Sequence, residues 1–344
     1  MAWTRPDYSR AAVDSAGRTY IDGKSTPEDR ERALAVINSW RSSHSYPLNT
    51  WQISLRKKAA DVDADPTVAQ RIKRLPSIRH KLERFPGMKL SRMQDIGGAR
   101  AVVASVDEVG DLVAYYLDTS RIKHKLVRHD DYIAGPKESG YRGVHLAYSY
   151  YSDRRSDWNG LKVEIQVRSR LQHGWATAVE TVGAFTQQAL KSSLGSDEWL
   201  RFFALMSSAL ALREHRALVP GTPDDSATLT KELRSAAKKL KVIERLRSYG
   251  TTLQHVEKTM DGVKGGHLFL LDLDLDAQQL TLWDFENAAQ ATEQYEALER
   301  GIEGQGNRDA VLVSVESINA LQRAYPNYFL DTTAFVESIE EAIA

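Results

Sequence analysis

The sequence predicts an α+β protein with an α/β domain over residues 1–215, a helical connector over 216–250 and a small α+β domain over 251–344. Three observations predict this organisation. Short apolar runs typical of buried strands alternate with longer helical patterns in the first part. The motif Pro220-Gly221-Thr222-Pro223 is the strongest break in the chain. Beyond about residue 250, strand-like runs return and acidic side chains outnumber basic ones.

The elements of the first part follow from local signals. Residues 1–25 are polar without a clear period, and we expect an arm or a short element there. Thr26 and Pro27 suit the N-cap and first position of an amphipathic helix. We expect further helices over 49–60, 66–85 with an interruption near Pro76, 107–117 and about 169–216, and strands over 99–105, 123–129, 144–151 and 161–168.

The second part is predicted in the same way. A helix rich in Lys and Arg covers about 226–248, within the connector. The tail begins with a strand pair, GGHLFLLDLDLD and QQLTLWDF. A helix over 286–300, a Gly-rich turn over 301–306, a strand over 310–315 and a closing helix follow.

Composition bounds the class of protein. The chain has 344 residues, is 42% hydrophobic and contains no cysteine, so a disulfide framework and a cysteine zinc site are excluded. No apolar run approaches the roughly 20 residues of a membrane span. The N-terminus lacks the apolar stretch of a secretory signal. We therefore expect a soluble, cytoplasmic protein without a membrane partner.

The net charge of zero conceals an uneven distribution. The segment from Leu271 to the C-terminus holds 15 acidic and 3 basic side chains, so it carries −12 and the chain before it carries +12. The segment 56–92 alone contains 11 basic and 4 acidic side chains. Such separation arises in ordinary globular proteins. It also suits a basic surface that binds a polyanion, with the acidic tail as its competitor.

Two carboxylates stand out as candidates for chemistry. In the segment 162–168, polar residues alternate with valine and isoleucine, so Glu164 falls among cations on one face of a strand. Asp95 precedes two glycines at the entrance of another strand, where the backbone can be approached closely. Together they suit one Mg²⁺. Taken alone, each has an ordinary explanation, as an outer strand face or a turn former.

Two basic motifs accompany them. The segment 71–84 is dense in Arg and Lys and suits a triphosphate, although an ordinary basic helix face explains it equally well. The segment 137–145 places an aromatic ring and cations in a Gly/Pro-bounded loop, which suits base stacking and phosphate contact or a plain surface loop.

In order and spacing, these motifs resemble the synthetase region of the RelA/SpoT family over about residues 60–190. The resemblance rests on Arg71-x-Lys73, Lys81, Arg84, Asp95-Ile-Gly-Gly-Ala-Arg100, Lys137-x-x-x-Tyr141-Arg142-Gly-Val-His145 and Val-Glu164-Ile-Gln166. The family transfers the β,γ-pyrophosphate of ATP to a ribose 3′-hydroxyl and releases AMP. The resemblance implies a nucleotidyltransferase-like mixed sheet flanked by helices.

The resemblance also implies residue roles on the donor side. Arg71 and Arg100 would sandwich the adenine of ATP. The phosphates would be bound by Lys73, Lys81 and Arg84. Asp95 and Glu164 would hold Mg²⁺, and Glu164 would take the proton of the attacking hydroxyl. Such chemistry needs charge neutralisation, in-line positioning and an activated hydroxyl more than covalent help from the protein.

On the acceptor side, Tyr141 would stack on the base of the acceptor. The other acceptor-binding residues implied by the match are Lys137, Arg142, His145 and Gln166. The hydrolase of long family members is not expected, because the single His129-Asp130 pair has no partner histidines at suitable spacing.

The whole layout resembles a narrower group, the fused toxin–antitoxin synthetases called CapRel. That likeness includes Tyr325 and Tyr328 in a C-terminal Tyr-x-x-Tyr, and a tail resembling a zinc finger without cysteines. It implies pyrophosphate transfer to the 3′-hydroxyl of the tRNA CCA end, which stops translation. It further implies a tail that blocks the adenine site through the two tyrosines until a phage protein, such as a capsid protein, binds.

Two alternatives remain open. The first is a small alarmone synthetase that uses GDP or GTP as acceptor, since the ATP side would be the same. The residues that favour tRNA are Arg56, Lys57 and Lys58, a basic group that a solvated helix face explains equally well. The second is a catalytically dead nucleotide or RNA sensor, against which the presence of Asp95, Glu164 and Tyr141 argues.

Overall fold

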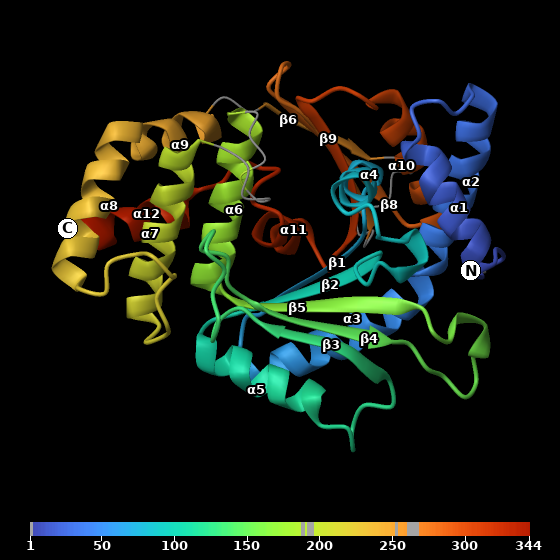
Figure 1. Cartoon of the computed structure of the whole chain (residues 1–344), viewed down its shortest axis with the longest axis horizontal. Helices are drawn as coiled ribbons and strands as arrows, with labels where there is room; N and C mark the ends of the chain where they lie inside the picture. The colour runs from blue at the N-terminus through green and yellow to red at the C-terminus, as the bar shows by residue number, and fades with distance from the viewer. Residues whose placement is uncertain (1–2, 187–189, 191–195, 252–253, 260–267) are drawn as a thin grey trace.

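A nine-stranded mixed sheet runs through the molecule in this computed structural model, which describes residues 3–186, 190, 196–251, 254–259 and 268–344 (Figure 1). The strand order is β3-β4-β5-β2-β1-β9-β7-β8-β6. The strands are β1 (Thr67–Ile72), β2 (Gly97–Val103), β3 (Lys125–Asp131), β4 (Val144–Ser149), β5 (Lys162–Ser169), β6 (Gln254–Thr259), β7 (Leu268–Asp274), β8 (Gln279–Phe285) and β9 (Arg308–Ser314). This arrangement of strands and helices confirms the predicted α+β class.

The strands of the tail extend the sheet of the first part. β1 and β9 are antiparallel neighbours, with Gln70 opposite Ser314 and Arg71 opposite Val313. Two pairings are parallel, β2 with β5 and β6 with β8, and the other pairings are antiparallel. The tail is therefore hydrogen-bonded directly to a strand that carries a predicted site residue, Arg71.

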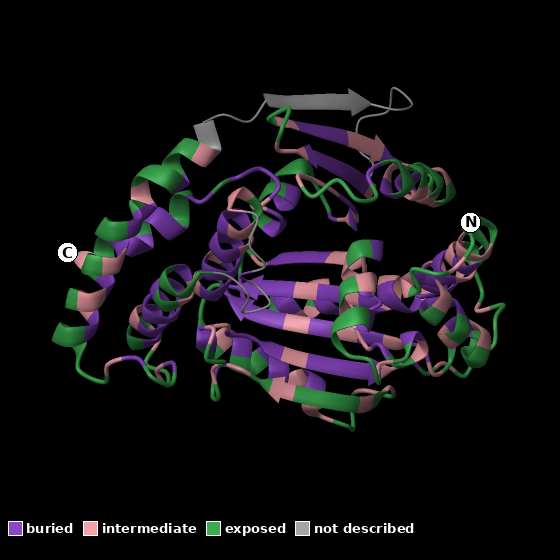
Figure 2. Ribbon diagram, turned by 45° about the horizontal axis from the view of Figure 1, so that its top comes forward, coloured by how far each residue is buried: buried purple, intermediate pink, exposed green. Residues whose placement is uncertain are grey.

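One face of the first five strands is covered by α3 (Ser45–Val62) and α5 (Val106–Leu117). α1 (Arg10–Ile21) and α2 (Pro27–Ser43) pack on each other and on α4 (Leu75–Arg84) and α3 beside the end of the sheet, and short 3₁₀ turns lie at Leu90–Arg92 and Ser156–Trp158. The alternate apolar residues of β5, among them Val163 and Ile165, pack with Leu55 of α3 in the largest core. Figure 2 shows the central strands buried and β3 exposed at the edge.

A second core joins the helices that follow the sheet. It contains α6 (Arg170–Phe185), α7 (Asp197–Arg213), α8 (Ser226–Leu240), α9 (Val242–Thr251) and α12 (Thr333–Ile343). The closing helix α12 thus packs with the connector helices α8 and α9, although most of the tail separates them in the sequence. None of the described helices is both long and apolar enough to span a bilayer.

The helices of the tail lie on opposite faces of its strands. α10 (Ala288–Gly301) packs against one face of β7 and β9, in a core that contains Leu270. α11 (Ile318–Ala324) lies over β1 on the other face, as Figure 1 shows. On that face, alternate residues of β7 and β9, such as Leu271, form a core with Tyr325 and Tyr328, which follow α11 directly. Ala69 of β1 belongs to this same core, so the tail seals against the sheet of the first part.

Two sequence predictions need correction. The segment 66–85 is not one helix: β1 precedes α4 (Leu75–Arg84), because Thr67 and Val68 favour a strand and Pro76 suits a helix start. The segment 1–25, where an arm or a short element was expected, contains the short helix α1. The helix over 226–248 is two helices, α8 and α9, because Lys241 between them has a left-handed φ of 51°.

Other predicted elements agree with the structure. Thr26 accepts a hydrogen bond from the Asp29 amide at the start of α2, as its N-cap position predicts. The strand pair of the tail forms as β7 and β8, although its first residues, 265–267, lie outside the described residues. The predicted helix over 169–216 contains α6 and α7. Most of the residues between these two helices also lie outside the described residues. The three-part division of the chain stays a prediction.

Candidate functional site

The strand pairings bring most of the predicted site residues onto one face of the sheet. Gln166 of β5 pairs with Arg100 of β2 on one side and with His145 of β4 on the other. Glu164 lies two residues back along β5, on the same side of the pleat. Arg71 of β1 lies on that face too, because it pairs with the residue two positions before Arg100. The opposite face is the apolar one, so this polar face is where chemistry can occur.

Asp95 lies just before β2, between two ammonium groups. Its Oδ2 is 2.8 Å from Nζ of Lys73 and its Oδ1 is 2.9 Å from Nζ of Lys81. Burial alone would raise the pKa of Asp95, but the two lysines lower it well below its usual value. Asp95 is therefore an ionised carboxylate that links the end of β1 to α4.

Glu164 is also held as a carboxylate. Its Oε1 accepts a hydrogen bond from Nδ1 of His145 at 3.0 Å, and its Oε2 accepts one from Nε2 of Gln166 at 2.7 Å. Burial is the largest single influence and raises the pKa of Glu164, but the hydrogen bond and charge of His145, together with the hydrogen bond from Gln166, bring the pKa below its ordinary value. The charge of Asp95 acts on Glu164 in the opposite direction, so the two carboxylates are electrostatic neighbours.

The donor set fits a magnesium ion bound together with substrate. Two carboxylates facing one region supply the hard oxygens that Mg²⁺ takes alongside nucleotide phosphates. Among the residues that the structure describes, no group of three or more His, Cys, Asp or Glu side chains is arranged to hold a metal ion. The pair of Asp95 and Glu164 therefore suits an ion that arrives with phosphates better than an all-protein cage.

Tyr141 lies at the edge of the same cluster. Its hydroxyl is hydrogen-bonded to Nε2 of His145 and accepts a hydrogen bond from Nη2 of Arg168 at 2.7 Å. Nζ of Lys137 lies 4.1 Å from the ring centre of Tyr132 and 5.2 Å from that of Tyr141. The structure thus brings the predicted acceptor residues Tyr141, His145 and Lys137 next to Glu164.

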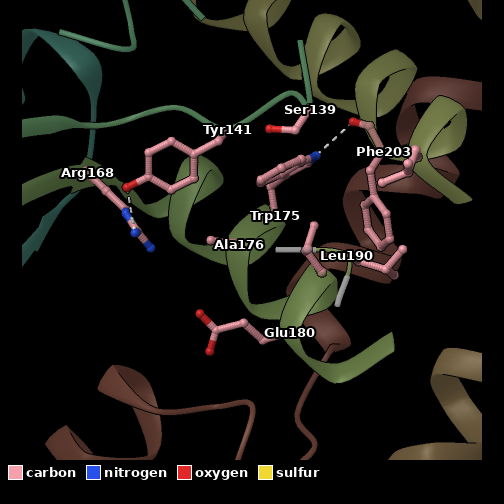
Figure 3. Close-up of a pocket in the computed structure, with 10 residues that line it drawn as sticks. Ser139, Tyr141, Arg168, Trp175, Ala176, Glu180, Leu190 and Phe203 are labelled. Atoms are coloured by element: carbon pink, nitrogen blue, oxygen red, sulfur yellow. Dashed lines mark hydrogen bonds between the residues drawn. The ribbon is translucent and has the colours of Figure 1, made fainter. Parts of the chain in front are cut away.

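Arg168 was missed by the sequence reasoning. It lies at the end of the alternating segment 162–168, which put it on the polar face without giving it a role. Figure 3 shows its guanidinium directed at Tyr141, in a small cavity of about 20 Å³ that Trp175, Glu180 and Phe203 also line. The alternation was the signal that would have identified it.

The tail contacts the two arginines predicted for adenine. Cζ of Arg100 lies 5.1 Å from the ring centre of Tyr325, and its Nη2 donates to the carbonyl oxygen of Ala324. Burial lowers the pKa of Arg100 to about 10. Arg71 interacts electrostatically with the side chains of Tyr325 and Tyr328. The end of α11 therefore lies at the predicted adenine position.

Tyr328 makes a different contact from its neighbour. Its hydroxyl donates to Oδ2 of Asp309 at 2.8 Å and accepts from Nη1 of Arg74 at 3.0 Å. Arg74 also forms an ion pair with Asp309. Tyr328 is 1% exposed and Tyr325 is 3% exposed, so both rings are enclosed. A cleft of about 840 Å³ remains between the tail and the first part, and Arg71, Arg74 and Tyr328 line it.

Other predicted residues lie outside the cluster. Arg142 is buried against α7, where its Nε donates to Oγ of Ser207 at 3.0 Å and its Nη2 to the carbonyl oxygen of Ala217. This conformation therefore gives Arg142 a structural contact instead of an acceptor-binding one. Arg84 is exposed, and its guanidinium lies 5.4 Å from the ring of Phe85.

The basic group proposed for tRNA lies on α3, under the opposite face of the sheet. Arg56 pairs with Glu316 at 2.7 Å, and Lys58 pairs with Asp61 at 2.7 Å, while Lys57 is exposed. Because α3 covers the apolar face, these residues do not line the carboxylate cluster. The sequence hint for a tRNA acceptor is therefore not supported by their position.

Together, the mixed sheet and the carboxylate cluster form a polar site that suits nucleotide phosphates and a divalent ion. Residues 70–187 match the model of the family described as the region found in RelA / SpoT proteins. The RelA/SpoT region expected from the motifs is thus confirmed over these residues.

Particular relatives are similar to part of the chain. GTP pyrophosphokinase YjbM of Bacillus subtilis (strain 168) is 38% identical over 112 residues, which are 32% of this chain and 52% of that protein. The chain therefore spans about half the length of this curated relative. Small alarmone synthetase 1 from Bacillus subtilis is 24% identical, with a TM-score of 0.42, over 50% of this chain and 88% of that one. A GTP pyrophosphokinase family protein from Streptococcus pneumoniae is 22% identical, with a TM-score of 0.42, over 58% of this chain and 93% of that one.

Proposed function

We propose that the chain is an autoinhibited pyrophosphotransferase that moves the β,γ-pyrophosphate of ATP onto a ribose 3′-hydroxyl. The observation that carries this proposal is the gathering of two ionised carboxylates, Asp95 and Glu164, among basic side chains on one sheet face. The match of residues 70–187 to the RelA/SpoT region supports the same chemistry.

In the proposed reaction, the acceptor oxygen forms a bond to the β-phosphorus of ATP. The bond from that phosphorus to the α,β-bridging oxygen breaks, and AMP leaves with the electron pair. Glu164 takes the proton of the attacking hydroxyl, and a positioned base of this type contributes roughly 10²- to 10⁴-fold. Lys73 and Lys81, which now neutralise Asp95, would carry part of the charge of the triphosphate.

Magnesium is the cofactor we propose, held by Asp95 and Glu164 together with ATP phosphates. When bound, such an ion neutralises the charge that accumulates on the triphosphate. Tyr141 would stack on the acceptor, with Lys137, His145 and Gln166 beside it. These three lie around Glu164, so an acceptor held there presents its hydroxyl to the carboxylate.

The proposed autoinhibition follows from the contacts of α11 and the residues after it. Tyr325 covers the guanidinium of Arg100, and Ala324 accepts a hydrogen bond from it, so adenine and this segment compete for one guanidinium. A tyrosine ring stacks on a guanidinium much as adenine does. We propose that ATP binds productively only when the segment that contains Tyr325 and Tyr328 withdraws.

The acceptor we propose is the 3′-terminal ribose of the tRNA CCA end, which would stop translation. This choice rests on the whole-chain likeness to fused toxin–antitoxin synthetases. A second candidate, GDP or GTP, is favoured by one specific observation, the 38% identity to a GTP pyrophosphokinase over 112 residues. The two candidates share the ATP side and differ only in acceptor.

The trigger we propose is a phage protein, such as a capsid protein, that binds the tail during infection. The activity would then serve phage defence by abortive infection. Moving the closed form from 99% to 1% requires the trigger to favour the open form by about 5.5 kcal/mol. An ordinary protein interface can supply a difference of this size.

The test uses the full chain with Tyr325→Ala and Tyr328→Ala, and ATP labelled in its γ-phosphate. Label in the 3′ end of deacylated tRNA supports the first choice, and label in GDP or GTP supports the second. Glu164→Gln in the same background should abolish both. If neither acceptor is labelled and no AMP forms with any nucleotide or tRNA, the proposed chemistry is wrong.

A further inference from the structure

We propose that Arg168 is a positioning residue that sets the direction of every hydrogen bond around Glu164. The side chains of Tyr141, His145, Glu164, Gln166 and Arg168 form a closed ring of hydrogen bonds. In this ring, Arg168 is the donor to both neighbours and Glu164 is the acceptor from both. The catalytic meaning of the inference rests on the proposed function, in which Glu164 is the general base.

One branch of the ring passes through the tyrosine and the histidine. Nη2 of Arg168 donates to the hydroxyl oxygen of Tyr141 at 2.7 Å. The phenol has one proton, which therefore points to its other partner, Nε2 of His145. A histidine that accepts at Nε2 carries its proton on Nδ1, and this Nδ1 donates to Glu164 Oε1 at 3.0 Å. The guanidinium at one end and the acceptor-only carboxylate at the other thus fix the same direction for all three bonds.

The second branch passes through the glutamine. The same Nη2 of Arg168 donates to Oε1 of Gln166 at 3.2 Å, which fixes the orientation of the amide. The amide nitrogen of Gln166 is then directed at Oε2 of Glu164, 2.7 Å away. Both oxygens of the carboxylate accept a hydrogen bond as a result, so its ionised form is favoured twice.

Arg168 is suited to this role because its guanidinium does not lose its proton in proteins. It is 4% exposed, and its Cζ lies 5.0 Å from the ring centre of Tyr141, as Figure 3 illustrates. Its stem is packed against Gly143, where φ is 140° and a Cβ would lie 3.0 Å from Cγ of Arg168. Only a glycine at 143 leaves this space, so the backbone holds the guanidinium in place.

Without Arg168, both branches are free to reverse. The hydroxyl of Tyr141 can then donate elsewhere, and the proton of His145 can move to Nε2, which leaves Nδ1 without a proton to offer Glu164. The amide oxygen of Gln166 loses the donor that orients it, so its nitrogen is held toward Glu164 less firmly. The other groups that act electrostatically on Glu164 are Asp95 and Lys137, together with Tyr141. None of these donates a hydrogen bond to Glu164 among the described residues.

The test compares the full wild-type chain with Arg168→Met, using ¹⁵N-labelled histidine. In the wild type, we expect the imidazole of His145 as the Nδ1–H tautomer, assigned by its loss in His145→Gln. In Arg168→Met, we expect a mixture of the two tautomers. A pure Nδ1–H tautomer in Arg168→Met would overturn the inference.

Two further variants separate this role from a structural one. Arg170→Met removes a nearby cation whose guanidinium binds Asp63 outside the ring, and it should not change the tautomer of His145. Tyr141→Phe removes the hydroxyl and so interrupts only the branch through His145. We then expect a mixture of His145 tautomers, and this result does not depend on whether Arg168→Met folds. If Tyr141→Phe keeps a pure Nδ1–H tautomer, the inference is wrong.

A kinetic readout links the inference to the proposed function. In the Tyr325→Ala background, Arg168→Met should lower kcat while KM for ATP stays nearly constant, because the orientation of Glu164 changes and the ATP-binding residues do not. If no variant transfers pyrophosphate, the proposed function fails, while the tautomer experiment still decides the role of Arg168.

Discussion

Glu299 of the tail and Arg41 of α2 form a buried ion pair, with Oε2 of Glu299 2.8 Å from Nη1 of Arg41. The two residues are 5% and 3% exposed. Nε of Arg41 also donates to the carbonyl oxygen of Lys73 at 2.9 Å, and Oε1 of Glu299 accepts from the amide of Leu75 at 3.0 Å. This ion pair thus joins α10 to the loop between β1 and α4. Lys73, the first of the predicted phosphate-binding lysines, lies in that loop.

We predict that Glu299→Ala destabilises the chain and raises basal pyrophosphate transfer. Breaking a buried pair leaves Arg41 uncompensated, which typically costs about 3–5 kcal/mol. The same change removes the acceptor of the Leu75 amide and loosens the tail. Urea unfolding measures the first effect, and AMP formation by the full chain measures the second.

The matched control is Glu303→Ala, on the next turn of the same region. Glu303 pairs with Arg30 at 2.7 Å, but both side chains are about one-third exposed. An exposed pair contributes at most about 1 kcal/mol, so the unfolding free energy should change little. Equal losses in Glu299→Ala and Glu303→Ala would show that the buried pair has no special role.

We predict that Tyr325→Ala activates the full chain. The substitution removes the ring above Arg100, a contact of about 0.5–2 kcal/mol, so AMP formation should rise roughly 2- to 30-fold. Calorimetric titration with a non-hydrolysable ATP analogue should show tighter binding in the variant. Expression of Tyr325→Ala with Tyr328→Ala should also halt growth without any trigger.

Tyr325→Phe distinguishes the ring from the hydroxyl. Phenylalanine keeps the face that covers Arg100, so this variant should stay inhibited. Tyr328→Phe instead removes the hydroxyl that bridges Arg74 and Asp309, and a partial rise in activity is expected. Activation of Tyr325→Phe to the level of Tyr325→Ala would exclude stacking as the inhibitory contact.

Sequence patterns predicted the cluster well where side chains alternate between the two faces of a strand. The alternation over 162–168 put Glu164 and Gln166 on one face of a strand, and the structure has them there. The Gly-Gly after Asp95 predicted the strand entrance in which that carboxylate lies. Both signals are local, and a sheet converts them into one polar face through its pairing register.

Long-range pairing explains what the sequence did not reveal. The segment 67–72 is a strand because it hydrogen-bonds to β2 on one side and, on the other, to β9, which lies close to the C-terminal end of the chain. Arg142 belongs to the same motif as Tyr141 yet hydrogen-bonds to Ser207 of α7, a contact between residues 65 positions apart that no local pattern reveals. Glu299 and Arg41 are likewise far apart in the chain, so no local pattern could pair them.

We predict that Asp95 contributes stability that depends on pH. Because its pKa is lowered in the folded chain, its contribution is complete above the ordinary carboxyl pKa of about 3.9 and is lost as pH falls below that value. Asp95→Asn should therefore be destabilising at pH 7, and its deficit relative to wild type should shrink by pH 3. Urea unfolding at both pH values measures the difference.

The control for this prediction is Asp111→Asn, on the exposed side of α5. Its effect on the unfolding free energy should be within about 0.5 kcal/mol at pH 7. A deficit in Asp95→Asn that is the same at pH 7 and pH 3 would contradict the lowered pKa of Asp95.

We predict that Gly140→Ala displaces the loop that carries the proposed acceptor-binding residues more than it destabilises the fold. Gly140 has a φ of 90°, and a Cβ there would lie 2.9 Å from Cβ of Ser207 and 2.9 Å from the ring of Trp175. Strain of this kind costs of order 1–3 kcal/mol, and it moves the loop that carries Lys137 and Tyr141. In the activated background, we therefore expect KM for the acceptor to rise while KM for ATP stays nearly constant.

Gly135→Ala is the comparison within the same loop. A Cβ at Gly135 would lie 3.7 Å from the carbonyl oxygen of Asp131, an ordinary contact, so stability and both KM values should be unchanged. Steady-state kinetics with each substrate varied in turn, together with thermal unfolding, measure these outcomes for both variants. A displaced Tyr141 would affect the proposed acceptor site and not the arginines proposed to bind adenine. An equal rise of the two KM values in Gly140→Ala would therefore mean that the loop does not act on the acceptor side alone.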